Sequence, residues 1–483
     1  MKPTRLVVLI VGLGLTVSTA AQAQKTERFD RDPQWDGHNN RMKARREAYN
    51  VRQDFGFSRT AHAGGKPGEL GGIVTPAAEP AYYAMATPNK TFDGALTASG
   101  TLYVPKGGGN TLVGFFNSNT LNEWRTPNSL VLRINGRGDG FHLHVEYCTS
   151  RWRAGGEFIG DVDPKSGKKQ QRLLPSDTVH KWSMRYDPSS AQGRGEVRVN
   201  FNGEDLIMVL DPGHKADGGT FNRFGFLNVL KSADGGGELW IDKLEVNGTN
   251  NEFETDPKWE GRNNRHTYKT LNIRPVFDFG YAASRHAGGA TAGEIGGLLF
   301  RGDEREPERL AYYGDDVGEL SLNDGLEASG KVVLRRGVTD STILFGYFHS
   351  TDSIRRSDAQ KSGIPENFVG WAIEGPSSQG FYFYPVYGLD KDSEGEAGAY
   401  AKDPPRIYPD GKPHDWTMRY GPQAQGGARI VLTLDGKRIE QRIPENHKSI
   451  GARFNRFGFV TTHIDGNGQE VFVDDLTYTA ARR

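Results

Sequence analysis

One short segment in the first half of the chain carries three side chains that could do chemistry. GFHLHVEY (140–147) reads as a strand, and residues two apart on a strand point to the same side. His142, His144 and Glu146 therefore share one face, and the apolar residues between them face the core. Two imidazoles and a carboxylate on one face could bind a metal or transfer protons. An ordinary solvent-facing strand without a ligand explains the pattern equally well.

The matching segment of the second half, GFYFYPVY (380–387), carries tyrosines in place of the histidines. Tyr382 and Tyr384 would share a face, and aromatic rings on a concave sheet can stack against the C–H faces of sugar rings. If neighbouring strands contribute to the same groove, the second half has the aromatic and acidic side chains of a glycan site. The residues expected to join the two tyrosines are His349, Trp371 and Glu374.

The first half would offer a more cationic groove. Arg133 and Arg151 lie in segments next to the histidine strand, and an Arg can neutralise a uronate carboxylate while a His or Tyr abstracts the adjacent proton. This is the requirement of a polysaccharide lyase. A glycoside hydrolase instead needs two carboxylates, about 5–10 Å apart. The candidate pairs are Glu146 with Glu69 and Glu374 with Glu294, which the sequence alone does not bring together.

A glycine-rich segment with one His and one Glu occurs once in each half. It reads HAGGKPGELGG around His62 and Glu69, and HAGGATAGEIGG around His286 and Glu294. Each pair could act as acid and base, or a His–carboxylate hydrogen bond could fix the imidazole tautomer. A structural loop in which the carboxylate binds backbone amides fits equally well. The second copy is one residue longer, so the two glutamates need not occupy the same position.

A second motif, W-x-G-x-N-N-R, begins each half at Trp35 and at Trp259. Arg41, Asn264 and Arg265 could bind sugar hydroxyls or carboxylates, because amides and the planar guanidinium offer several hydrogen bonds at once. The structural alternative is a turn in which Asn adopts left-handed backbone and Arg pairs locally. We favour the turn, although Arg is the harder residue to explain that way.

These motifs recur in the same order because the chain contains an internal duplication. FDRDPQWDGHNNR (29–41) corresponds to FETDPKWEGRNNR (253–265), and FNRFGF occurs unchanged at 221–226 and 454–459. Collinear matches over such a length indicate a duplicated domain. We therefore expect two domains at 25–249 and 250–483, each long enough for one core without disulfides.

The first residues, 1–24, have the features of a secretory signal peptide. Two basic residues precede an apolar run at 6–17, and Ala21–Ala23 forms a small-x-small cleavage site. The apolar run is short for a bilayer span. We expect a mature chain that starts near Gln24, is secreted or periplasmic, and keeps no membrane span. An uncleaved anchor is the alternative.

Short alternating segments separated by turns dominate both halves, which predicts an all-β fold of two tandem antiparallel β-sandwich (jelly-roll) domains. One short helix is expected at 46–54 (REAYNVRQD). The strand order, with HxWxMRY (180–186, 414–420) and a closing FNRFGF…(V/I)D(D/K)L segment, resembles the concanavalin A-like lectin/glucanase superfamily across both halves. The ExDxxE spacing of that superfamily's retaining glucanases is absent, so the resemblance implies no catalytic residue here.

The same resemblance suggests a structural Ca²⁺ near the end of the chain. In similar sandwich domains carboxylates beside glycine-rich turns hold such an ion, and Asp474 with Asp475 has this setting. In the first copy Lys243 follows Asp242, which weakens the case there. Paired surface carboxylates are also common without an ion.

Composition excludes several classes of protein. Lys plus Arg and Asp plus Glu both total 60, so nothing indicates a general polyanion clamp for nucleic acid. The single cysteine, Cys148, excludes an intramolecular disulfide. No GxSxG, HExxH or GxxxxGK[ST] motif is present, which argues against serine hydrolases, zinc proteases and P-loop enzymes.

These observations favour an exported carbohydrate-active protein whose partner is a polysaccharide or oligosaccharide. The leading interpretation is a polysaccharide-degrading enzyme, either a lyase or a glycoside hydrolase, that acts in a concave sheet groove. The alternative is a non-catalytic glycan-binding protein with two sites, because duplication raises avidity. A structural envelope protein is the third possibility, and the fold by itself can host all three. The oligomeric state stays open.

Overall fold

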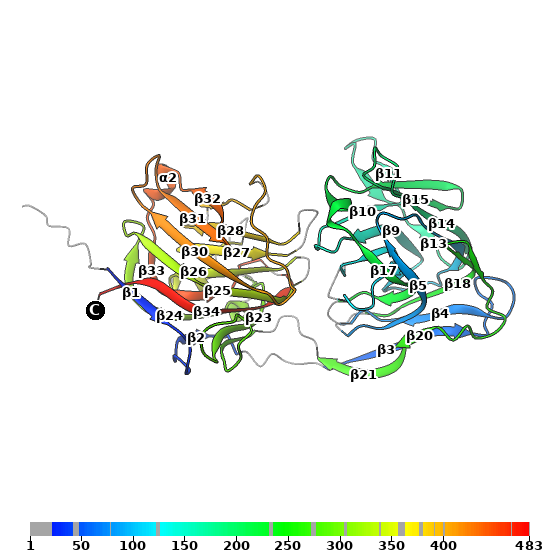
Figure 1. Cartoon of the computed structure of the whole chain (residues 1–483), viewed down its shortest axis with the longest axis horizontal. Coiled ribbons are helices and arrows are strands. Elements are labelled where there is room, and N and C mark those ends of the chain that lie inside the picture. The colour runs from blue at the N-terminus through cyan, green and yellow to red at the C-terminus, as the bar shows by residue number, and fades with distance from the viewer. Residues whose placement is uncertain are drawn as a thin grey trace, which may run out of the picture.

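The computed structural model describes residues 22–41, 48–77, 79–121, 126–230, 235–271, 277–303, 307–337, 340–355, 363–375, 380–390, 392–398, 401–464 and 466–482. Antiparallel sheets make up almost all of its regular secondary structure, which confirms the predicted all-β class. Two sandwiches lie side by side (Figure 1). Among the described residues, no helix has the length and apolar character needed to cross a membrane.

Sandwich 1 packs two sheets against each other, named here after one strand of each. The β9 sheet has the order β10-β9-β8-β7-β17-β5-β20, with β13 beside β9. The β6 sheet has the order β16-β15-β14-β6-β18-β4-β3-β21, with β19 beside β18. The elements are β3 (Ala48–Ser58), β4 (Glu69–Val74), β5 (Tyr82–Thr91), β6 (Leu96–Tyr103), β7 (Asn110–Phe116), β8 (Ser129–Gly136), β9 (Gly140–Cys148), β10 (Ala154–Phe158), β11 (Gly160–Val162), β12 (Lys169–Gln171), β13 (Leu174–Pro175), β14 (Val179–Asp187), β15 (Glu196–Phe201), β16 (Glu204–Val209), α1 (His214–Asp217), β17 (Thr220–Asn228), β18 (Gly237–Val246), β19 (Thr249–Asn251), β20 (Glu260–Arg262) and β21 (Arg265–Leu271).

Sandwich 2 repeats this plan. Its β28 sheet has the order β2-β24-β33-β26-β27-β28-β29, and its β25 sheet has the order β22-β23-β34-β25-β30-β31-β32, with β1 beside β34. The elements are β1 (Gln22–Glu27), β2 (Asp36–His38), β22 (Asp278–Ala282), β23 (Glu294–Phe300), η1 (Pro307–Arg309), β24 (Tyr312–Ser321), β25 (Leu326–Arg336), β26 (Thr342–Phe348), η2 (Asp352–Ile354), β27 (Phe368–Glu374), β28 (Tyr382–Gly388), β29 (Glu394–Glu396), β30 (Pro413–Gly421), β31 (Arg429–Leu434), β32 (Lys437–Arg442), α2 (Glu445–Lys448), β33 (Arg453–Val460) and β34 (Gly468–Ala481).

Strand alternation builds a separate apolar core in each sandwich. In sandwich 1 the inward residues of β9 (Phe141, Leu143, Val145 and Tyr147) are buried against the other sheet. In sandwich 2 Phe345, Trp371 and Trp416 take part in an aromatic cluster with ring centroids 5.0–5.9 Å apart. The two sandwiches touch where Trp152 stacks on Tyr408, with ring centroids 5.8 Å apart.

The segment expected to form a helix at 46–54 is a strand over its described residues, 48–54. β3 covers Ala48–Ser58 and pairs with β4 and with β21. Val51, Gln53 and Phe55 are buried, whereas Arg52 and Asp54 are exposed. Because this burial alternates with a period of two, sheet pairing outweighs the weak helical pattern of the isolated segment.

The N-terminal segment belongs to the second sandwich rather than the first. β1 pairs with β34 and β2 pairs with β24, so residues 22–41 complete sandwich 2 (Figure 1). The homologous segment, residues 249–265, completes sandwich 1 through β19–β18 and β20–β5 pairing. The sheets therefore cross the boundary that the sequence repeat places at residues 249 and 250. Each sandwich is built from the body of one repeat and the opening segment of the other.

Candidate functional site

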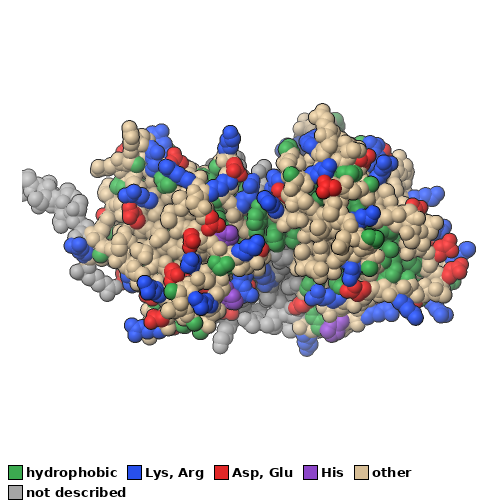
Figure 2. All heavy atoms as spheres, in the orientation of Figure 1, with side chains coloured by type: hydrophobic (Ala, Val, Ile, Leu, Met, Phe, Trp, Pro, Cys, Tyr) green, Lys and Arg blue, Asp and Glu red, His purple; other side chains and the backbone are tan. Residues whose placement is uncertain are grey.

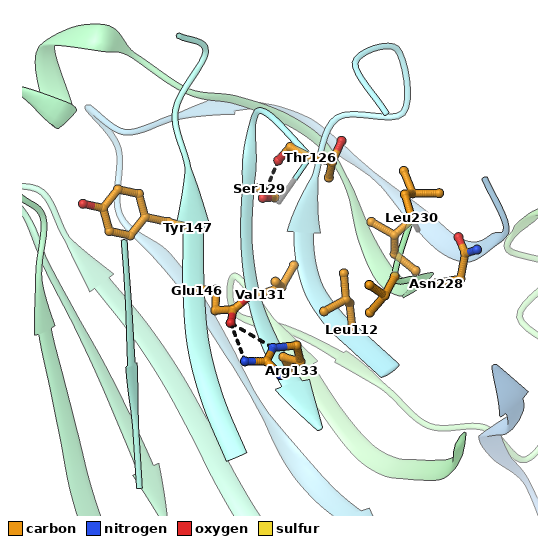
Figure 3. Close-up of a pocket in the computed structure, with 11 residues that line it drawn as sticks. Leu112, Thr126, Ser129, Val131, Arg133, Glu146, Tyr147, Asn228 and Leu230 are labelled. Atoms are coloured by element: carbon orange, nitrogen blue, oxygen red, sulfur yellow. Dashed lines mark hydrogen bonds and ion pairs between the residues drawn. The ribbon is translucent and has the colours of Figure 1, made fainter. Parts of the chain in front are cut away.

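The outer face of the β9 sheet carries the polar residues that the strand pattern predicts on one side. In the β8–β9 pairing Asn135 lies opposite His142, and Arg133 lies opposite His144. Glu146 follows two residues further along β9. Figure 3 shows Arg133 and Glu146 directed at each other, with Tyr147 on the opposite side of the strand.

Arg133 and Glu146 form a half-buried ion pair on this face. Both Nε and Nη2 of Arg133 lie 2.8 Å from Oε1 of Glu146, and their side chains are 15% and 12% exposed. The pair borders a hollow of about 20 Å³ between Leu112, Val131 and Leu227. A hollow of this size holds about one water molecule. The guanidinium is thus already neutralised, and it offers its remaining N–H groups to a ligand rather than a free charge.

The two histidines differ in their surroundings. Burial, followed by the charge of Arg137, lowers the pKa of His142, so that its imidazole is neutral near pH 7. Its Nδ1 is buried and makes no hydrogen bond within the described residues. His144 is buried against the ring of Phe158, with centroids 5.9 Å apart. His142 can therefore accept a proton, whereas His144 packs as part of the sheet surface.

The same position in sandwich 2 has different chemistry. Glu374 lies opposite Tyr382 in the β27–β28 pairing, and Glu396 lies opposite Val386 in the β28–β29 pairing. Tyr384 stands between these rows, on the strand between the two glutamates. The three side chains line a cavity of about 80 Å³ together with Arg301, Thr342, Leu344, Ile364, Val386, Thr462 and Ile464.

One tyrosine hydroxyl joins the two carboxyl groups. Tyr384 Oη donates to Glu374 Oε2 over 3.2 Å, and it also bonds the side chain of Glu396. Tyr384 is only 3% exposed, whereas Glu396 is exposed at the edge of the cavity. Arg301 lies beside them and donates from Nε and Nη2 to Thr342 Oγ1 over 3.0 and 2.7 Å. The arrangement links a half-buried acid to a solvent-facing acid.

Burial raises the pKa of Glu374, and the nearby Arg301 lowers it by less. Burial and then the charge of Glu374 raise the pKa of Glu396. Burial also holds the pKa of Tyr384 well above its usual value, so its phenol keeps its proton near neutral pH. A carboxyl group that keeps a proton towards neutral pH can act as a general acid.

Three expected groove residues of the second half do not form an open surface. Trp371 faces inwards, is fully buried, and stacks on Phe345. His349 is 7% exposed, and its Nδ1 accepts hydrogen bonds from the backbone of the following turn. Tyr382 is 3% exposed. The prediction is wrong for Trp371 because its strand places it on the core side, and the other two are covered.

The glycine-rich segments have the structural role that was one of the two alternatives. Glu69 accepts hydrogen bonds from the backbone N–H groups of His62 and Ala63, at 2.8 and 2.7 Å. Glu294 accepts the same two bonds from His286 and Ala287 at the same distances, despite the extra residue. Both glutamates are fully buried.

The ring of His62 packs on Trp240, with centroids 5.0 Å apart, and the ring of His286 packs on Phe472, at 4.8 Å. Glu294 lies on the β25 sheet, whereas Glu374 lies on the β28 sheet. Glu69 and Glu146 are likewise on different sheets of sandwich 1. Neither carboxylate pair considered for a hydrolase is brought together.

The W-x-G-x-N-N-R motif binds each opening segment to its sandwich through hydrogen bonds. Asn264 Nδ2 donates to Phe55 O over 2.7 Å, and Arg265 bonds Phe57 O. Arg41 repeats this with Nη1 on Asp278 and Nη2 on Tyr281 O, both at 2.6 Å. Because these donors are used on backbone and local carboxylate groups, the expectation that Arg41, Asn264 and Arg265 bind substrate is replaced by a structural role.

Asp474 and Asp475 lie under the second glycine-rich loop. Burial, and less strongly Asp475 and Glu294, raise the pKa of Asp474 to about 7. A Cβ on Gly289 would lie 1.8 Å from Asp474 Oδ2, so the loop requires glycine there. Within the described residues no group of three or more His, Cys, Asp or Glu is arranged to hold a metal ion. A structural Ca²⁺ at these aspartates stays a prediction.

Two residues of the sandwich 2 cavity were not found from the sequence. Glu396 lies in a three-residue strand, EGE, too short to show a pattern. Arg301 follows β23, a strand of the other sheet, and reaches the cavity from the edge. The acidic sequence EGE, which follows an aromatic strand, could have indicated Glu396. No sequence pattern indicated Arg301.

Comparison of the sequence with models of protein families and with curated proteins finds no match. Among solved structures, the mouse laminin α1 chain domains LG4-5 are 11% identical over 81% of this chain and 85% of that one, with a TM-score of 0.23. An alginate lyase of Pseudomonas aeruginosa is 14% identical over 40% of this chain and 86% of its own, with a TM-score of 0.24. An endo-β-1,4-glucuronan lyase of Trichoderma reesei is 10% identical over 46% and 94%, with a TM-score of 0.26. These likenesses concern the β-sandwich architecture alone.

Proposed function

We propose that this protein is an exported polysaccharide-degrading enzyme whose acid–base site is the sandwich 2 cavity. The observation that carries the proposal is the pair of glutamates joined through Tyr384, both with a raised pKa, one half-buried and one exposed. Clusters of perturbed titratable groups in a cavity are typical of active sites. Two solved structures with the sandwich architecture are, by their names, an alginate lyase and a glucuronan lyase, which is compatible with the proposal.

The chemistry that this pair favours is hydrolysis of a glycosidic bond. Glu374 would donate its proton to the leaving glycosidic oxygen, and Glu396 as carboxylate would take a proton from the attacking water at the anomeric carbon. Tyr384 would hold both carboxyls in position. β-Elimination with Tyr384 as the base is disfavoured, because the raised pKa of Tyr384 keeps its phenol protonated.

The cavity sets a limit on how a sugar could bind. Its volume is about 80 Å³, and Glu396 and Ile464 lie exposed at its edge. A sugar ring would lie at this edge, with one oxygen substituent inside. A polymer can reach such an edge without entering a closed pocket.

A second candidate function is favoured by the β9 face of sandwich 1. Asn135, His142 and the Arg133–Glu146 pair offer fixed donors and acceptors in one plane, which suits the hydroxyls of a sugar. A neutral His142 beside arginines could also serve as the base of an elimination. This face would then bind a glycan, or act as a lyase site, while sandwich 2 hydrolyses or is inactive.

The test is a screen of the mature protein against neutral and acidic polysaccharides. New reducing ends and the ultraviolet absorbance of unsaturated products are recorded in the same reaction. Reducing ends without new absorbance, lost in Glu374→Gln and kept in Glu146→Gln, are the expected result. Absorbance that rises with chain cleavage and is lost in His142→Ala would replace hydrolysis by elimination in sandwich 1. Retention on a glycan gel without any product would make this a binding protein.

Export is a separate part of the proposal. It rests on the charge, apolar run and small residues of residues 1–24, of which 1–21 lie outside the described structure. Cleavage after Ala23 would leave Gln24–Glu27 paired with Leu476–Thr479, so the β1–β34 ladder would survive. N-terminal sequencing of the protein from the culture medium or periplasm tests it, and a chain that still begins at Met1 would contradict it.

A further inference from the structure

The opening segment of the chain, residues 22–41, is named here the latch. It forms a ladder with the last strand, from Gln22 opposite Ala481 to Glu27 opposite Leu476, and a second short ladder from Asp36 to His38 with β24. Phe29 and Trp35 are buried in the sandwich 2 core, and Asp36 accepts a hydrogen bond from Tyr312 Oη at 2.7 Å. The latch therefore behaves as a peptide ligand of sandwich 2.

Sandwich 1 contains the same arrangement with a different connection. β19 pairs with β18 in the register that β1 takes on β34, but β18 runs directly into β19 through a tight turn. Asn247 and Gly248 of this turn have φ of 47° and 80°, as expected for a two-residue hairpin. In sandwich 2 no such turn joins the paired strands, because β1 (Gln22–Glu27) and β34 (Gly468–Ala481) lie far apart in the sequence. The latch is tethered only at its far end, through residues 42–47 to β3 of sandwich 1.

Nothing in the contacts of the latch requires that it come from the same molecule. The ladders use backbone groups, and among the described residues the side-chain contacts of the latch are made to sandwich 2, as in Lys25–Asp315 at 2.5 Å and Asn40 Nδ2 to Phe279 O at 2.6 Å. A second copy presents the same groove. Exchange of an identical element between copies costs little free energy, because every contact is recovered.

The order of synthesis favours such an exchange. The latch is synthesised well before β34, the strand that receives its β1 part. Until β34 is made, β1 lacks this partner strand in its own chain, whereas a finished copy nearby could offer one. Once its own β34 exists, the short tether gives the intramolecular latch a high effective concentration.

We propose that the latch is exchangeable, and that the partner it fits is sandwich 2 of a second copy of this chain. Exchange would join two molecules through sandwich 2 while leaving sandwich 1, with its continuous β18–β19 hairpin, closed within each chain. The resulting dimer would carry four sandwiches and thus two copies of each sheet face. This inference does not depend on the proposed enzymatic function.

The test uses full-length variants with single cysteines at paired positions. Thr26 lies opposite Thr477, with hydroxyl oxygens 3.2 Å apart, so the latch of one copy on β34 of another brings Thr26→Cys and Thr477→Cys together for a disulfide. The two variants are mixed at high concentration, unfolded, refolded and oxidised. The native Cys148 is buried and does not compete in the folded protein.

The matched control is the corresponding pair of sandwich 1. Glu245 and Asn250 are both exposed and lie opposite each other in the β18–β19 hairpin, whose strands cannot exchange separately. A mixture of Glu245→Cys and Asn250→Cys measures disulfides from chance collision. We expect at least about tenfold more disulfide-linked dimer from the latch mixture than from the control. Equal yields from the two mixtures, or no dimer in either, would overturn the proposal.

Discussion

The β9 face of sandwich 1 and the β28 face of sandwich 2 occupy the same place in the same fold, yet they carry different charged side chains. Where Arg133 pairs with His144 across the strands, Ala372 pairs with Tyr384. In sandwich 1 Gly156 of β10 lies opposite Glu146 of β9, whereas in sandwich 2 Glu396 of β29 lies opposite Val386 of β28. Sandwich 1 thus neutralises its buried charge, whereas Glu374 and Glu396 form no ion pair within the described residues.

The difference shows that a duplicated scaffold can hold different charged groups at the same sheet position. A paired Arg and Glu satisfy each other and stabilise the sheet face only as a unit, since removal of one leaves a buried charge. Glu374 and Glu396 have no ion-pair partner among the described residues, and burial raises the pKa of both although Arg301 lies nearby. Under the proposed function, the same sheet position would bind in one sandwich and transfer protons in the other.

The variant Glu374→Gln is expected to have the largest effect. The amide keeps the shape and the contact with Tyr384 but cannot give up a proton. We expect hydrolytic activity to fall by about 10²–10⁴-fold with the fold intact, as is usual for loss of a general acid. Initial rates of reducing-end release, with circular dichroism as a check of folding, measure this. Glu146→Gln is the matched control, and an equal loss there would place the chemistry in sandwich 1.

The variants Trp35→Ala and Trp259→Ala compare the latch, which completes sandwich 2, with the homologous segment 249–265, which completes sandwich 1. Trp35 is 7% exposed and packs on Phe29 at 5.4 Å, so its loss should destabilise sandwich 2 by about 3–4 kcal/mol. Trp259 is only partly buried against the sandwich 1 core, and its loss should cost less. Denaturant unfolding followed by hydrogen exchange identifies which sandwich opens first. Loss of sandwich 1 in Trp35→Ala would contradict the strand pairing described here.

Arg133→Ala tests whether the sandwich 1 pair is structural. It leaves Glu146 half-buried without its partner, and we expect a loss of about 2–3 kcal/mol in the free energy of unfolding. Replacement of both residues, Arg133→Met with Glu146→Leu, should recover most of this. Urea unfolding of the single and double variants checks it. If the double variant also loses glycan binding, the pair contributes to a ligand site as well as to the fold.

A pH dependence of the free energy of unfolding is expected from Asp474. Its folded pKa of about 7 lies above the unfolded value of 3.8, so the folded state binds the proton more tightly and stability falls as pH rises between these values. The expected slope is about 1 kcal/mol per pH unit near pH 5–6. In Asp474→Asn this slope should flatten, whereas Asp242→Asn in sandwich 1 should change it less because Asp242 is 8% exposed. The free energy of unfolding of both variants, measured at a series of pH values, checks this expectation.

Much of the fold could be predicted from the sequence because it depends on local periodicity. The alternation in GFHLHVEY placed His142, His144 and Glu146 outward, and the pairing of β8 with β9 agrees. The same rule would have placed Trp371 inward on β27, because Ala372 and Glu374 alternate with it. The helix expected at 46–54 is wrong because the pairing of β3 with β4 and β21 outweighs the weak helical pattern of the isolated segment.

The amino-acid sequence by itself determined the duplication, the all-β class and the outward residues of each central strand, since these follow from repeats and a period of two. Only the tertiary structure decided which half the W-x-G-x-N-N-R segments complete, because Asn40 and Arg41 find their hydrogen-bond partners about 240 residues away. It also joined Glu374 to Glu396 through Tyr384. Such contacts depend on which strands lie side by side, and strand neighbours are a property of the folded sheet rather than of any local stretch of sequence.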